Sequence, residues 1–564
     1  MRRAAAFLAL LLASLTTLAQ TQGAARTRFY TIALHDVVDT IGEEDDGIVA
    51  TEDDTITTDK LVALLELIRA SGMHVLNLDD IDAAKRGIRP LPERAILLTI
   101  DDGYRSLYTR VYPLLLAYRM PIVASLVGEW MDTPADGMVR YGGTSVPRSR
   151  FITWAQAREM ADSGLVEFAS HSYSLHKGVR ANPQGGERPA TVGPIYDAAT
   201  GYATHAQYRA RLADDLERSR ATMREHLGRV PRALAWPYGR YRGAALEIAR
   251  EAGFDFAFTL EAEPADLARP FAIARFPPKG NPTLEDMIPA IRTYGVPRPV
   301  QTMVCVDPAR LAGEELEARL GTTIERVRKL GANAVAIDPF VRDAQGEPVA
   351  AWFPNAQLPL RADVLSRIAW QLQTRAGVRV FVRIPRPFGA AVPQDFERLA
   401  QDLADAVQLD GVLFEAAPAF DVDPVAFGEP PWQIRERRAR LDAARLSPAQ
   451  AQVMSLFRAL ERQYPGTRLA LVSPAATASM AIADLTFVEV RPGERPKVPE
   501  GSRRFGPWIT SPDGPPDAEA IRAVARAFKA EGSLAAGWCP DDPLSDVPKA
   551  EIVAPETSAA RRPE

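Results

Sequence analysis

The stretch LLTIDDGYRS (Leu97–Ser106) places two adjacent carboxylates, Asp101 and Asp102, directly after an apolar run. The run is typical of a buried strand. Two carboxylates at its end should repel each other and resist removal from water. A positive partner must therefore compensate for them, and Gly103 lets the backbone turn sharply at this point. We interpret the stretch as the end of a buried parallel strand that carries a functional site.

Strand-like and helix-like segments alternate on both sides of this stretch. The strand-like segments before residue 297 are 28–36, 74–80, 94–103, 121–128, 166–172, 232–239 and 254–260. Strict alternation implies a parallel sheet covered by helices. Because no strand is followed by a Rossmann-type glycine loop, we expect an α/β barrel of about seven strands that need not close completely. A polar insert at 177–204 interrupts the alternation.

A second alternating set follows the Pro-containing linker TYGVPRPV (293–300). Its strand-like segments are 302–307, 334–338, 378–385, 410–416, 468–473, 485–490, 503–510 and 534–541. Eight strands over this length predict a (β/α)8 barrel, which takes roughly 250 residues. If the barrel closes, its first and last strands are neighbours, so Cys305 and Cys539 approach each other. A disulfide and two separate buried thiols both remain open.

Composition and the chain's start predict an exported protein with two domains. The 564 residues carry a formal net charge of −5, which does not point to nucleic acid as a partner. Two arginines precede an apolar run that ends near Ala19, which is typical of a cleavable signal peptide. The alternative, a membrane anchor, needs about 20 apolar residues.

We therefore expect no transmembrane span and a periplasmic location. No cysteine follows the signal to accept a lipid, since the only two are Cys305 and Cys539. The expected segments are a signal peptide at 1–19, a linker at 20–27, domains at 28–297 and 298–546, and a disordered tail at 547–564.

Acids and histidines follow several of the predicted strands in the first domain. His35 follows the first strand, Asp101 and Asp102 another, and His171 and His176 a third. Since the carboxyl ends of barrel strands converge on one face, these side chains should meet. Asp102, His171 and His176 form a ligand set for a divalent metal with open positions. Asp101 is then free to accept a proton from the attacking water, and His35 can protonate the leaving group.

The motifs TIDDGY, ASHSYSLH and WPYG resemble those of the NodB-type polysaccharide deacetylases, carbohydrate esterase family 4. The resemblance spans residues 28–297 and is strongest to the PgaB-type branch, which acts on poly-β-1,6-N-acetyl-D-glucosamine. That branch has a histidine motif near the N-terminus, as in ALHDVVD here. It also has an H-S-x-x-x-H pair, as in FITWAQAREMADSGLVEFASHSYSLH (151–176).

The resemblance implies metal-dependent N-deacetylation of this exopolysaccharide, which supports polymer export and biofilm formation. A backbone amide near Tyr238 would hold the oxyanion, and an arginine would orient the base. Arg275 is the first candidate for that arginine and Arg232 the second. Zinc is the expected ion, with nickel or cobalt as alternatives. An outer-membrane export porin is a further expected partner. The alternatives are a deacetylase of peptidoglycan or an O-acetylated polysaccharide, or a glycan-binding export scaffold.

The second domain resembles the glycoside-hydrolase-like barrel of the same branch, most clearly over 352–378. It departs from that branch after the strand DGVLF, where an acidic pair is replaced by Glu415 followed by two alanines. Glycoside hydrolysis normally needs two carboxyl groups. Asp307 and Asp338, also at predicted strand ends, leave a rebuilt pair and a bifunctional enzyme open. We expect a degenerate barrel that binds or guides glycan.

Three tryptophans in the second domain allow two interpretations. Trp352, Trp508 and Trp538 are either stacking faces for sugar rings or members of the core.

Overall fold

The computed structural model describes residues 27–285, 287 and 301–539, with gaps. The gaps are residues 43, 46–47, 50–54, 142–143, 262, 386–394, 416–430, 442, 474–481, 492, 494–504, 511–517 and 531–534. The expected signal peptide at 1–19, the linker at 293–300 and the expected tail at 547–564 lie outside the described residues, as does all but the last residue of the linker at 20–27.

The chain divides into two compact units. The first comprises residues 1–177, 212–240 and 246–296, and the second comprises 178–211, 241–245 and 297–564. The division falls next to the expected boundary at 297/298. It also assigns the polar insert to the second unit, although the insert interrupts the first domain in sequence. Each unit is described by itself below.

The first unit is built on an eight-stranded sheet with the order β17-β16-β11-β8-β7-β1-β18, and β6 pairs with β7 off this path. The strands are β1 (Arg28–Leu34), β6 (His74–Leu76), β7 (Ala95–Ile100), β8 (Ile122–Leu126), β11 (Val166–Ser170), β16 (Ala233–Ala235), β17 (Phe256–Phe258) and β18 (Ala265–Asp266). All seven expected strands are present. Neighbours pair in parallel, except β18, which is antiparallel to β1.

A short irregular segment completes this sheet where a further barrel strand would lie. Ile273 bridges Phe258 of β17, and Phe276 bridges Ile32 of β1, each as an isolated parallel bridge. The barrel of the first unit is therefore closed by single bridges, in line with the expectation that it need not close completely. Arg275 sits on this closing segment, between the two bridges.

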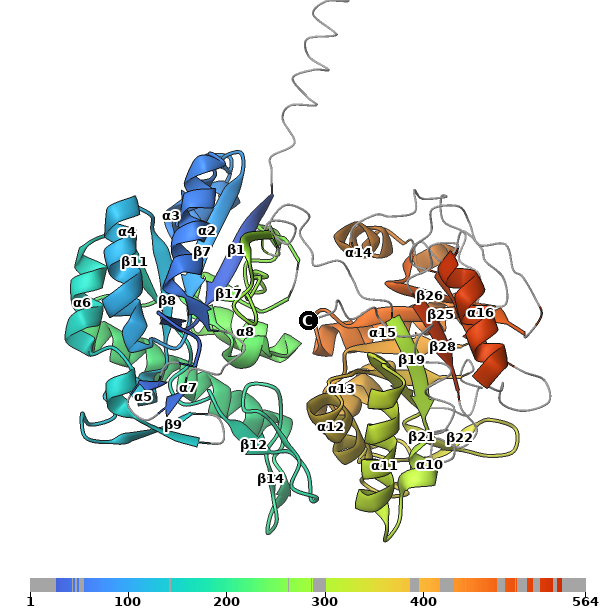
Figure 1. Cartoon of the computed structure of the whole chain (residues 1–564). Helices are drawn as coiled ribbons and strands as arrows, with labels where there is room; N and C mark the ends of the chain where they lie inside the picture. Colours follow the sequence, from blue (N-terminus) through green and yellow to red (C-terminus); the bar gives the residue numbers. More distant parts are fainter. Residues whose placement is uncertain are drawn as a thin grey trace, which may run out of the picture. The chain divides into compact units, whose positions relative to one another are not determined.

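Helices cover the outside of the sheet, as Figure 1 shows. They are α2 (Thr58–Ala70), α3 (Leu78–Lys85), α4 (Tyr112–Tyr118), α5 (Gly128–Asp132), α6 (Trp154–Asp162), α7 (His205–Leu227) and α8 (Gly243–Glu251). A π-helical turn, η1 (Leu107–Val111), precedes α4. The helix α6 begins with a capping box in which Thr153 and Gln156 satisfy each other's backbone amides.

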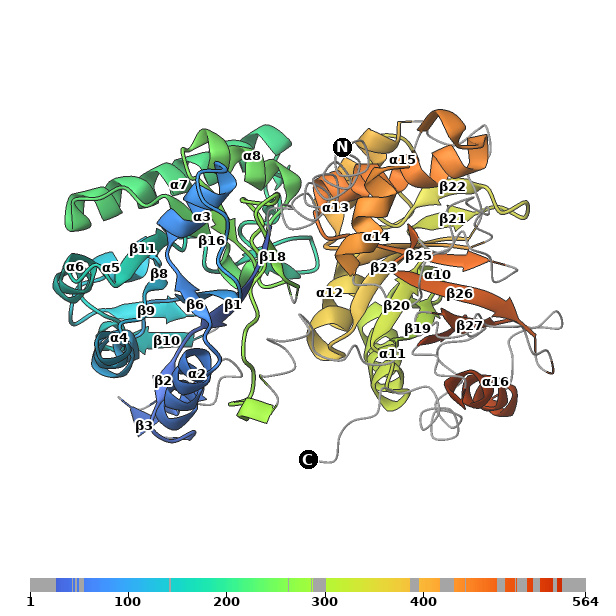
Figure 2. The ribbon, with the colours of Figure 1, turned by 90° about the horizontal axis from the view of Figure 1, so that it is seen from above.

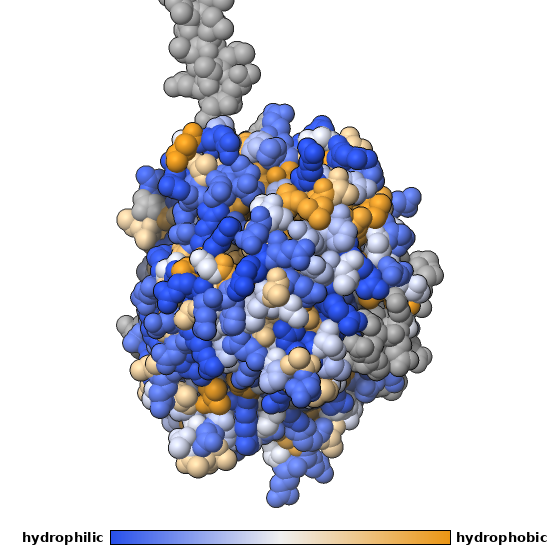
Figure 3. All heavy atoms as spheres, turned by 90° about the vertical axis from the view of Figure 1, so that its left-hand side faces the viewer, coloured by the Kyte–Doolittle hydropathy of each residue, from blue (hydrophilic) through white to orange (hydrophobic). Residues whose placement is uncertain are grey.

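The apolar residues of this unit form two layers. One layer packs between the sheet and the helices and includes Ile122 and Phe168, and the other lines the inside of the barrel and includes Val123 and Ala169. This alternation follows from the two faces of each strand. On the face that Figure 3 shows, hydrophilic side chains predominate and apolar ones form small scattered groups.

The chain also contains short antiparallel hairpins, two of them within the polar insert. They are β9 (Met138–Tyr141) with β10 (Thr144–Pro147), β12 (Gly178–Arg180) with β13 (Glu187–Pro189), β14 (Tyr196–Asp197) with β15 (Gly201–Tyr202), and β3 (Glu44–Asp45) with β4 (Ile48–Val49). Two further short strands, β2 (Val37–Val38) and β5 (Ile56–Thr57), pair in parallel. The polar insert thus contains two hairpins that its sequence did not predict.

The second unit contains a closed parallel barrel of eight strands. They are β19 (Gln301–Val306), β20 (Ala334–Ile337), β23 (Arg379–Ile384), β24 (Gly411–Phe414), β25 (Arg468–Ser473), β26 (Leu485–Val490), β27 (Phe505–Ile509) and β28 (Ala535–Trp538). Each coincides with an expected strand, so the predicted (β/α)8 barrel is confirmed. Gly411 and Gly537 lie where an added Cβ would come within 2.5 Å of a neighbouring aromatic ring.

Helices surround this barrel in Figure 2. They are α10 (Pro308–Leu311), α11 (Leu316–Lys329), α12 (Leu365–Arg375), α13 (Phe396–Ala406), α14 (Pro431–Ala439), α15 (Pro448–Gln463) and α16 (Ala518–Ala530). A hairpin, β21 (Phe340–Arg342) with β22 (Pro348–Ala351), follows β20.

Cys305 and Cys539 form a disulfide across the closure seam of the barrel. Cys305 lies on β19, Cys539 directly follows β28, and these two strands pair in parallel. Of the two alternatives that the sequence left open, the disulfide is the one observed. It joins residues separated by 234 positions.

Buried arginines attach the insert and residues 241–245 to the rest of the second unit. Arg188 in the insert donates to the Asp405 carbonyl over 2.7 Å and to the Ala181 carbonyl over 3.0 Å. Arg242, fully buried, pairs with the Asp405 carboxylate and donates to Gln463 Oε1 over 2.6 Å. These contacts explain why the insert is grouped with the second unit.

Within the described part of the chain, no helix is both long enough and apolar enough to cross a membrane.

Candidate active site

Three side chains converge at the carboxyl ends of two strands, Asp102 after β7 and both His171 and His176 after β11. The Nε2 atoms of His171 and His176 each lie 3.4 Å from Oδ1 of Asp102. The three candidate ligand atoms are all within 4.8 Å of one another, and all three residues are buried. The structure therefore brings together the ligand set that the sequence predicted.

The hydrogen bond of His171 and the pKa of His176 are compatible with metal binding at this point. His171 Nδ1 lies 2.8 Å from the Ala235 carbonyl oxygen, which can only accept. Nδ1 therefore carries the hydrogen, and Nε2 is the ring atom that faces Asp102. Burial opposes a charged ring, but the carboxylates of Asp101 and Asp102 raise the pKa of His171, and a cation at Nε2 would take the place of that proton. Burial lowers the pKa of His176 to about 4, so its imidazole is neutral.

Asp102 Oδ1 is buried and finds no hydrogen-bond partner among the described residues. An unsatisfied buried carboxylate oxygen is costly. Here it shares a small space with the Nε2 atoms of His171 and His176. One carboxylate oxygen and two imidazole nitrogens are a suitable donor set for a zinc-like divalent ion. The residues present thus fit the expected metal.

The backbone at the strand ends adopts left-handed conformations that non-glycine residues rarely use. Asp102 has φ 72°, Ser172 has φ 68° and Tyr238 has φ 58°. They follow β7, β11 and β16 in turn, and strain of this kind concentrates at functional sites. Gly103 also has positive φ, and an added Cβ would lie 2.6 Å from Leu126 Cδ2. The glycine in the DDG motif is therefore required for both conformation and space.

Asp101 is held by Arg275 in a fully buried two-point ion pair. Nη1 donates to Oδ1 over 2.8 Å and Nη2 donates to Oδ2 over 2.7 Å. Arg275 also donates to the Thr259 carbonyl and the Thr99 hydroxyl, which fix its guanidinium plane. Burial opposes ionisation of Asp101, but Arg275 and the nearby histidines hold the pKa of its carboxyl well below the usual range. Asp101 is thus a carboxylate, with the arginine placed as the first candidate predicted.

Arg232, the second candidate for orienting the base, lies elsewhere. It donates to Glu167 from Nε over 2.7 Å and from Nη2 over 3.0 Å, and it pairs with Asp79 over 2.7 Å. Arg232 precedes β16 and Glu167 lies near the start of β11, away from the carboxyl ends of these strands. That assignment was wrong, because Arg232 serves an ion-pair network at the opposite end of the sheet.

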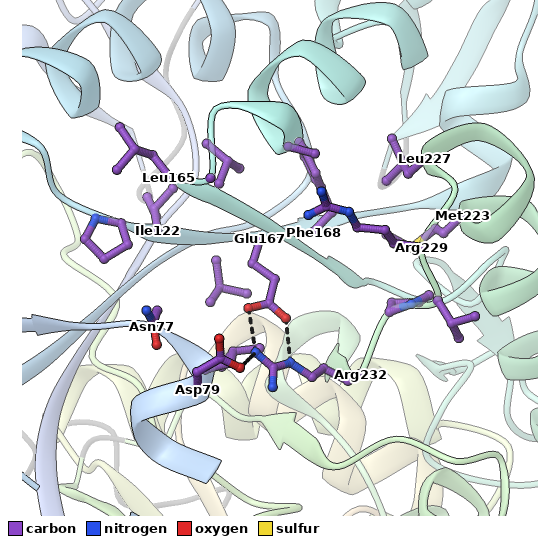
Figure 4. A pocket seen from close by; sticks show the side chains of 18 residues that line it. Asn77, Asp79, Ile122, Leu165, Glu167, Phe168, Met223, Leu227, Arg229 and Arg232 are labelled. Carbon is purple, nitrogen blue, oxygen red and sulfur yellow. Dashed lines mark hydrogen bonds and ion pairs between the residues drawn. The ribbon is translucent and has the colours of Figure 1, made fainter. Parts of the chain in front are cut away.

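The Arg232 network lines a separate cavity, shown in Figure 4. The cavity measures about 310 Å³ and lies between the starts of β8 and β11 and the end of α7. Ile122, Phe168 and Met223 form apolar walls, and Arg229 is also among the lining residues. Of the predicted site residues, only Arg232, the rejected second candidate, lines this cavity.

His35 and Tyr238 complete the set of predicted site residues. His35 follows β1, and its Nδ1 is buried without a hydrogen-bond partner among the described residues. Its charge contributes to lowering the pKa of both Asp101 and Asp102, so it lies near both carboxyls. Tyr238 lies in the turn Pro237–Gly239 with its ring centroid 4.4 Å from that of His176.

Asp215 is a positioning residue that sequence reasoning missed. Its two carboxylate oxygens accept the backbone amides of Tyr173 and Ser174, each over 2.8 Å, and it is buried on α7. These amides lie in the loop between His171 and His176, so Asp215 shapes the spacing of the two ligands. An acid within a long polar helix gives no sequence signal for this role.

An aromatic group around His176 was also missed. The Trp130 ring lies 4.9 Å from the His176 ring, and the Tyr141 ring lies 6.2 Å from it. Both come from the region between β8 and α6, which carries no recognisable motif.

In the described part of the second unit, the acids at the strand ends are all engaged. Arg383 donates to both oxygens of Glu415, over 3.0 and 2.8 Å. Arg342 pairs with Asp338 over 2.6 Å. Asp307 caps α10 by accepting the Ala309 amide over 2.9 Å. Among the described residues, these acids therefore serve arginines and a helix cap.

The tryptophans of the second unit belong to its core. Trp352, Trp508 and Trp538 are 5%, 3% and 3% exposed, so none presents an open face for a sugar ring in this structure.

Comparison with known proteins gives the class first. Residues 88–257 match the family model described as polysaccharide deacetylase, and residues 311–386 match the model described as hypothetical glycosyl hydrolase family 13. The chain belongs to the polysaccharide deacetylase family, with a glycosyl-hydrolase-like second barrel.

Individual relatives narrow the similarity within that family. The chain is 36% identical over 399 residues to poly-β-1,6-N-acetyl-D-glucosamine N-deacetylase of Escherichia coli K12. The match covers 64% of this chain and 59% of the relative, so the chain spans somewhat over half of that protein's length.

Two solved structures are also similar. A de-N-acetylase from Aggregatibacter actinomycetemcomitans is 33% identical, covering 47% of this chain and 99% of that one, with a TM-score of 0.44. The BpsB deacetylase domain from Bordetella bronchiseptica is 39% identical, covering 44% of this chain and 95% of that one, with a TM-score of 0.39.

Proposed function

We propose that this chain removes acetyl groups from N-acetylglucosamine units of poly-β-1,6-N-acetyl-D-glucosamine in a metal-dependent reaction. The single observation that carries the proposal is the site itself. Asp102, His171 and His176 offer three ligand atoms within 4.8 Å, beside an Asp101 that Arg275 keeps ionised. The names of the relatives support the choice of substrate.

Asp102, His171 and His176 would hold the ion. A bound divalent ion supplies Lewis-acid polarisation of the acetyl carbonyl and makes the attacking water more acidic. Zinc suits one carboxylate and two imidazoles, and nickel and cobalt suit the same donors.

Asp101 acts as the proton acceptor for the attacking water. Both of its oxygens receive hydrogen bonds from Arg275, but a carboxylate oxygen has two acceptor positions, so each keeps one for the water. The two-point contact also fixes the direction in which those positions point. Arg275 is therefore a positioning residue for the base.

His35 acts as the proton donor to the departing amine. Water adds to the acetyl carbon, the C–N bond breaks, and acetate and a free amine are the products. The amide of Tyr238 is the proposed donor to the oxyanion, in a turn that places this residue beside His176. The glucosamine product becomes cationic at neutral pH.

The second unit is proposed to bind or guide the glycan without cleaving it. Its strand-end acids are engaged by Arg383, Arg342 and a helix cap, which opposes the two free carboxyl groups that hydrolysis requires. We place the reaction in the periplasm during polymer export for biofilm formation, with an outer-membrane porin as a candidate partner. The apolar start of the chain supports that location.

The test is an assay of acetate and free amine released from β-1,6-linked N-acetylglucosamine oligomers by the full chain. Metal-loaded protein should release both in equal amounts, and chelated protein should release neither until metal is restored. Peptidoglycan and an O-acetylated glycan serve as comparison substrates. Preference for either of them, or full activity after metal removal, would contradict the proposal.

A further inference from the structure

Tyr141 reaches the candidate metal centre from a hairpin outside every motif used above. It ends β9, and its hydroxyl donates to Oδ2 of Asp102 over 3.4 Å. Oδ2 is the carboxylate oxygen that the two histidines do not share, since both approach Oδ1. The two oxygens of Asp102 thus have different surroundings.

The ring of Tyr141 packs on the same side of the centre. It stacks on His176 with centroids 6.2 Å apart and an interplanar angle of 19°, and it lies 5.3 Å from Trp130. Trp130 meets the His176 ring edge-on at 4.9 Å. One tyrosine therefore contacts a carboxylate ligand through its hydroxyl and lies against an imidazole ligand through its ring.

The base of this hairpin is firmly anchored. Arg148, buried just after β10, donates to the carbonyl oxygens of Met131 and Phe151 over 3.1 Å and of Ile152 over 2.8 Å. Val139 on β9 is also buried in a small aromatic cluster with Trp130. The position of Tyr141 is thus determined by packing and by three charge-assisted hydrogen bonds.

We propose that Tyr141 is a positioning residue for the metal centre, which rests on the metal site of the proposed function. A carboxylate can present either oxygen, or both, to a cation. The Tyr141 hydroxyl takes one acceptor position of Oδ2 and so favours Oδ1 as the ligand atom, beside the Nε2 atoms of His171 and His176. Hydrogen-bond partners of metal ligands typically account for about 10- to 100-fold in metal affinity or activity.

The experiment is Tyr141→Phe in the full chain, which removes the hydroxyl and keeps the ring. The zinc dissociation constant is measured by competition with a chromogenic chelator, and the cobalt-loaded protein is examined by visible absorption. We expect zinc binding to weaken by about 10-fold or more and the cobalt bands to shift. Tyr108→Phe is the matched control, since Tyr108 donates to Glu159 on the surface. Circular dichroism and thermal melting check the fold.

The outcomes separate this inference from the proposed function. Tyr141→Phe with wild-type zinc affinity and an unchanged cobalt spectrum would overturn the role of Tyr141 while leaving the metal site intact. A wild-type chain that binds neither ion would overturn the proposed function and this inference with it. If Tyr141→Phe melts like wild type yet binds zinc more weakly, the effect is local to the centre and the inference stands.

Discussion

The two units place acids at the same kind of position, the carboxyl ends of parallel strands, but surround them differently. In the first unit, Asp102 keeps a buried oxygen without a hydrogen-bond partner among the described residues, beside two imidazoles. In the second unit, Asp338 and Glu415 are each paired with an arginine. The position in the fold is therefore not enough to make an active site. The local counter-charge decides whether an acid can bind an ion or only a neighbouring side chain.

The first unit contains both situations in adjacent residues. Asp101 has its cation within the protein, Arg275, whereas Asp102 pairs with no arginine or lysine among the described residues and faces the two imidazoles. This difference addresses the electrostatic problem of the DDG motif, because one carboxylate is neutralised by an arginine and the other is placed to bind an ion. Substitutions in either unit can test this comparison.

Among the substitutions considered, Asp102→Asn is expected to reduce deacetylation the most. The amide oxygen is a neutral and weaker ligand, so the chain should lose its stoichiometric zinc. Lewis-acid catalysis is worth several kcal/mol, so deacetylation should fall by about 10³-fold or more. Zinc content after desalting and acetate release are the measurements. A variant that keeps zinc and activity would show that Asp102 is not a ligand.

Asp101→Asn should distinguish the role of Asp101 from that of Asp102. General base catalysis contributes about 10²- to 10⁴-fold, so acetate release should fall by at least 10²-fold while zinc binding persists. Zinc content after desalting and acetate release are again the measurements. If zinc were lost as well, Asp101 would be part of the ligand set and the division of roles between the two acids would be wrong.

Arg275→Lys should reduce deacetylation less than the two preceding substitutions do. It tests how Arg275 positions Asp101. Lysine keeps the charge but loses the two-point contact with Asp101, and a hydrogen bond to a charged group is worth about 1.5–3 kcal/mol. We expect kcat to fall by roughly 10-fold or more, with zinc content unchanged. Arg232→Lys is the control, since Arg232 pairs with Glu167 and Asp79 at the other end of the sheet. Equal losses in both variants would argue for a general structural effect.

The smallest effect is expected for Glu415→Gln in the second unit. Glu415 is committed to Arg383 and is not among the residues proposed to act in deacetylation, so the deacetylation rate should change by less than about twofold. The length of partially deacetylated polymer after incubation should be the same for wild type and variant. Chain shortening by wild type that disappears in Glu415→Gln would show that the second barrel cleaves glycan.

Much of this molecule follows from local patterns in the chain. Apolar runs and their alternation with helical segments predicted fifteen strands, all of which are present, because strand and helix periodicities depend on near neighbours. The convergence of Asp101, Asp102, His171 and His176 followed from one further rule, that carboxyl ends of parallel strands meet on one face. Arg232 shows the limit of such reasoning. It stands near a strand, but it precedes β16 instead of following it, so it lies at the wrong end.

By itself, the sequence determined the two barrels, their order and the ligand set, since each depends on periodicity or on residues at strand ends. Only the tertiary structure decided which arginine faces Asp101, which partners Glu415 and Asp338 take, and that Asp215 and Tyr141 contact the candidate metal ligands or the loop between them. It also decided that the polar insert belongs with the second unit. These contacts join residues that are distant in sequence and carry no periodic signal, so their pairing depends on packing and on the cost of leaving a buried charge without a partner.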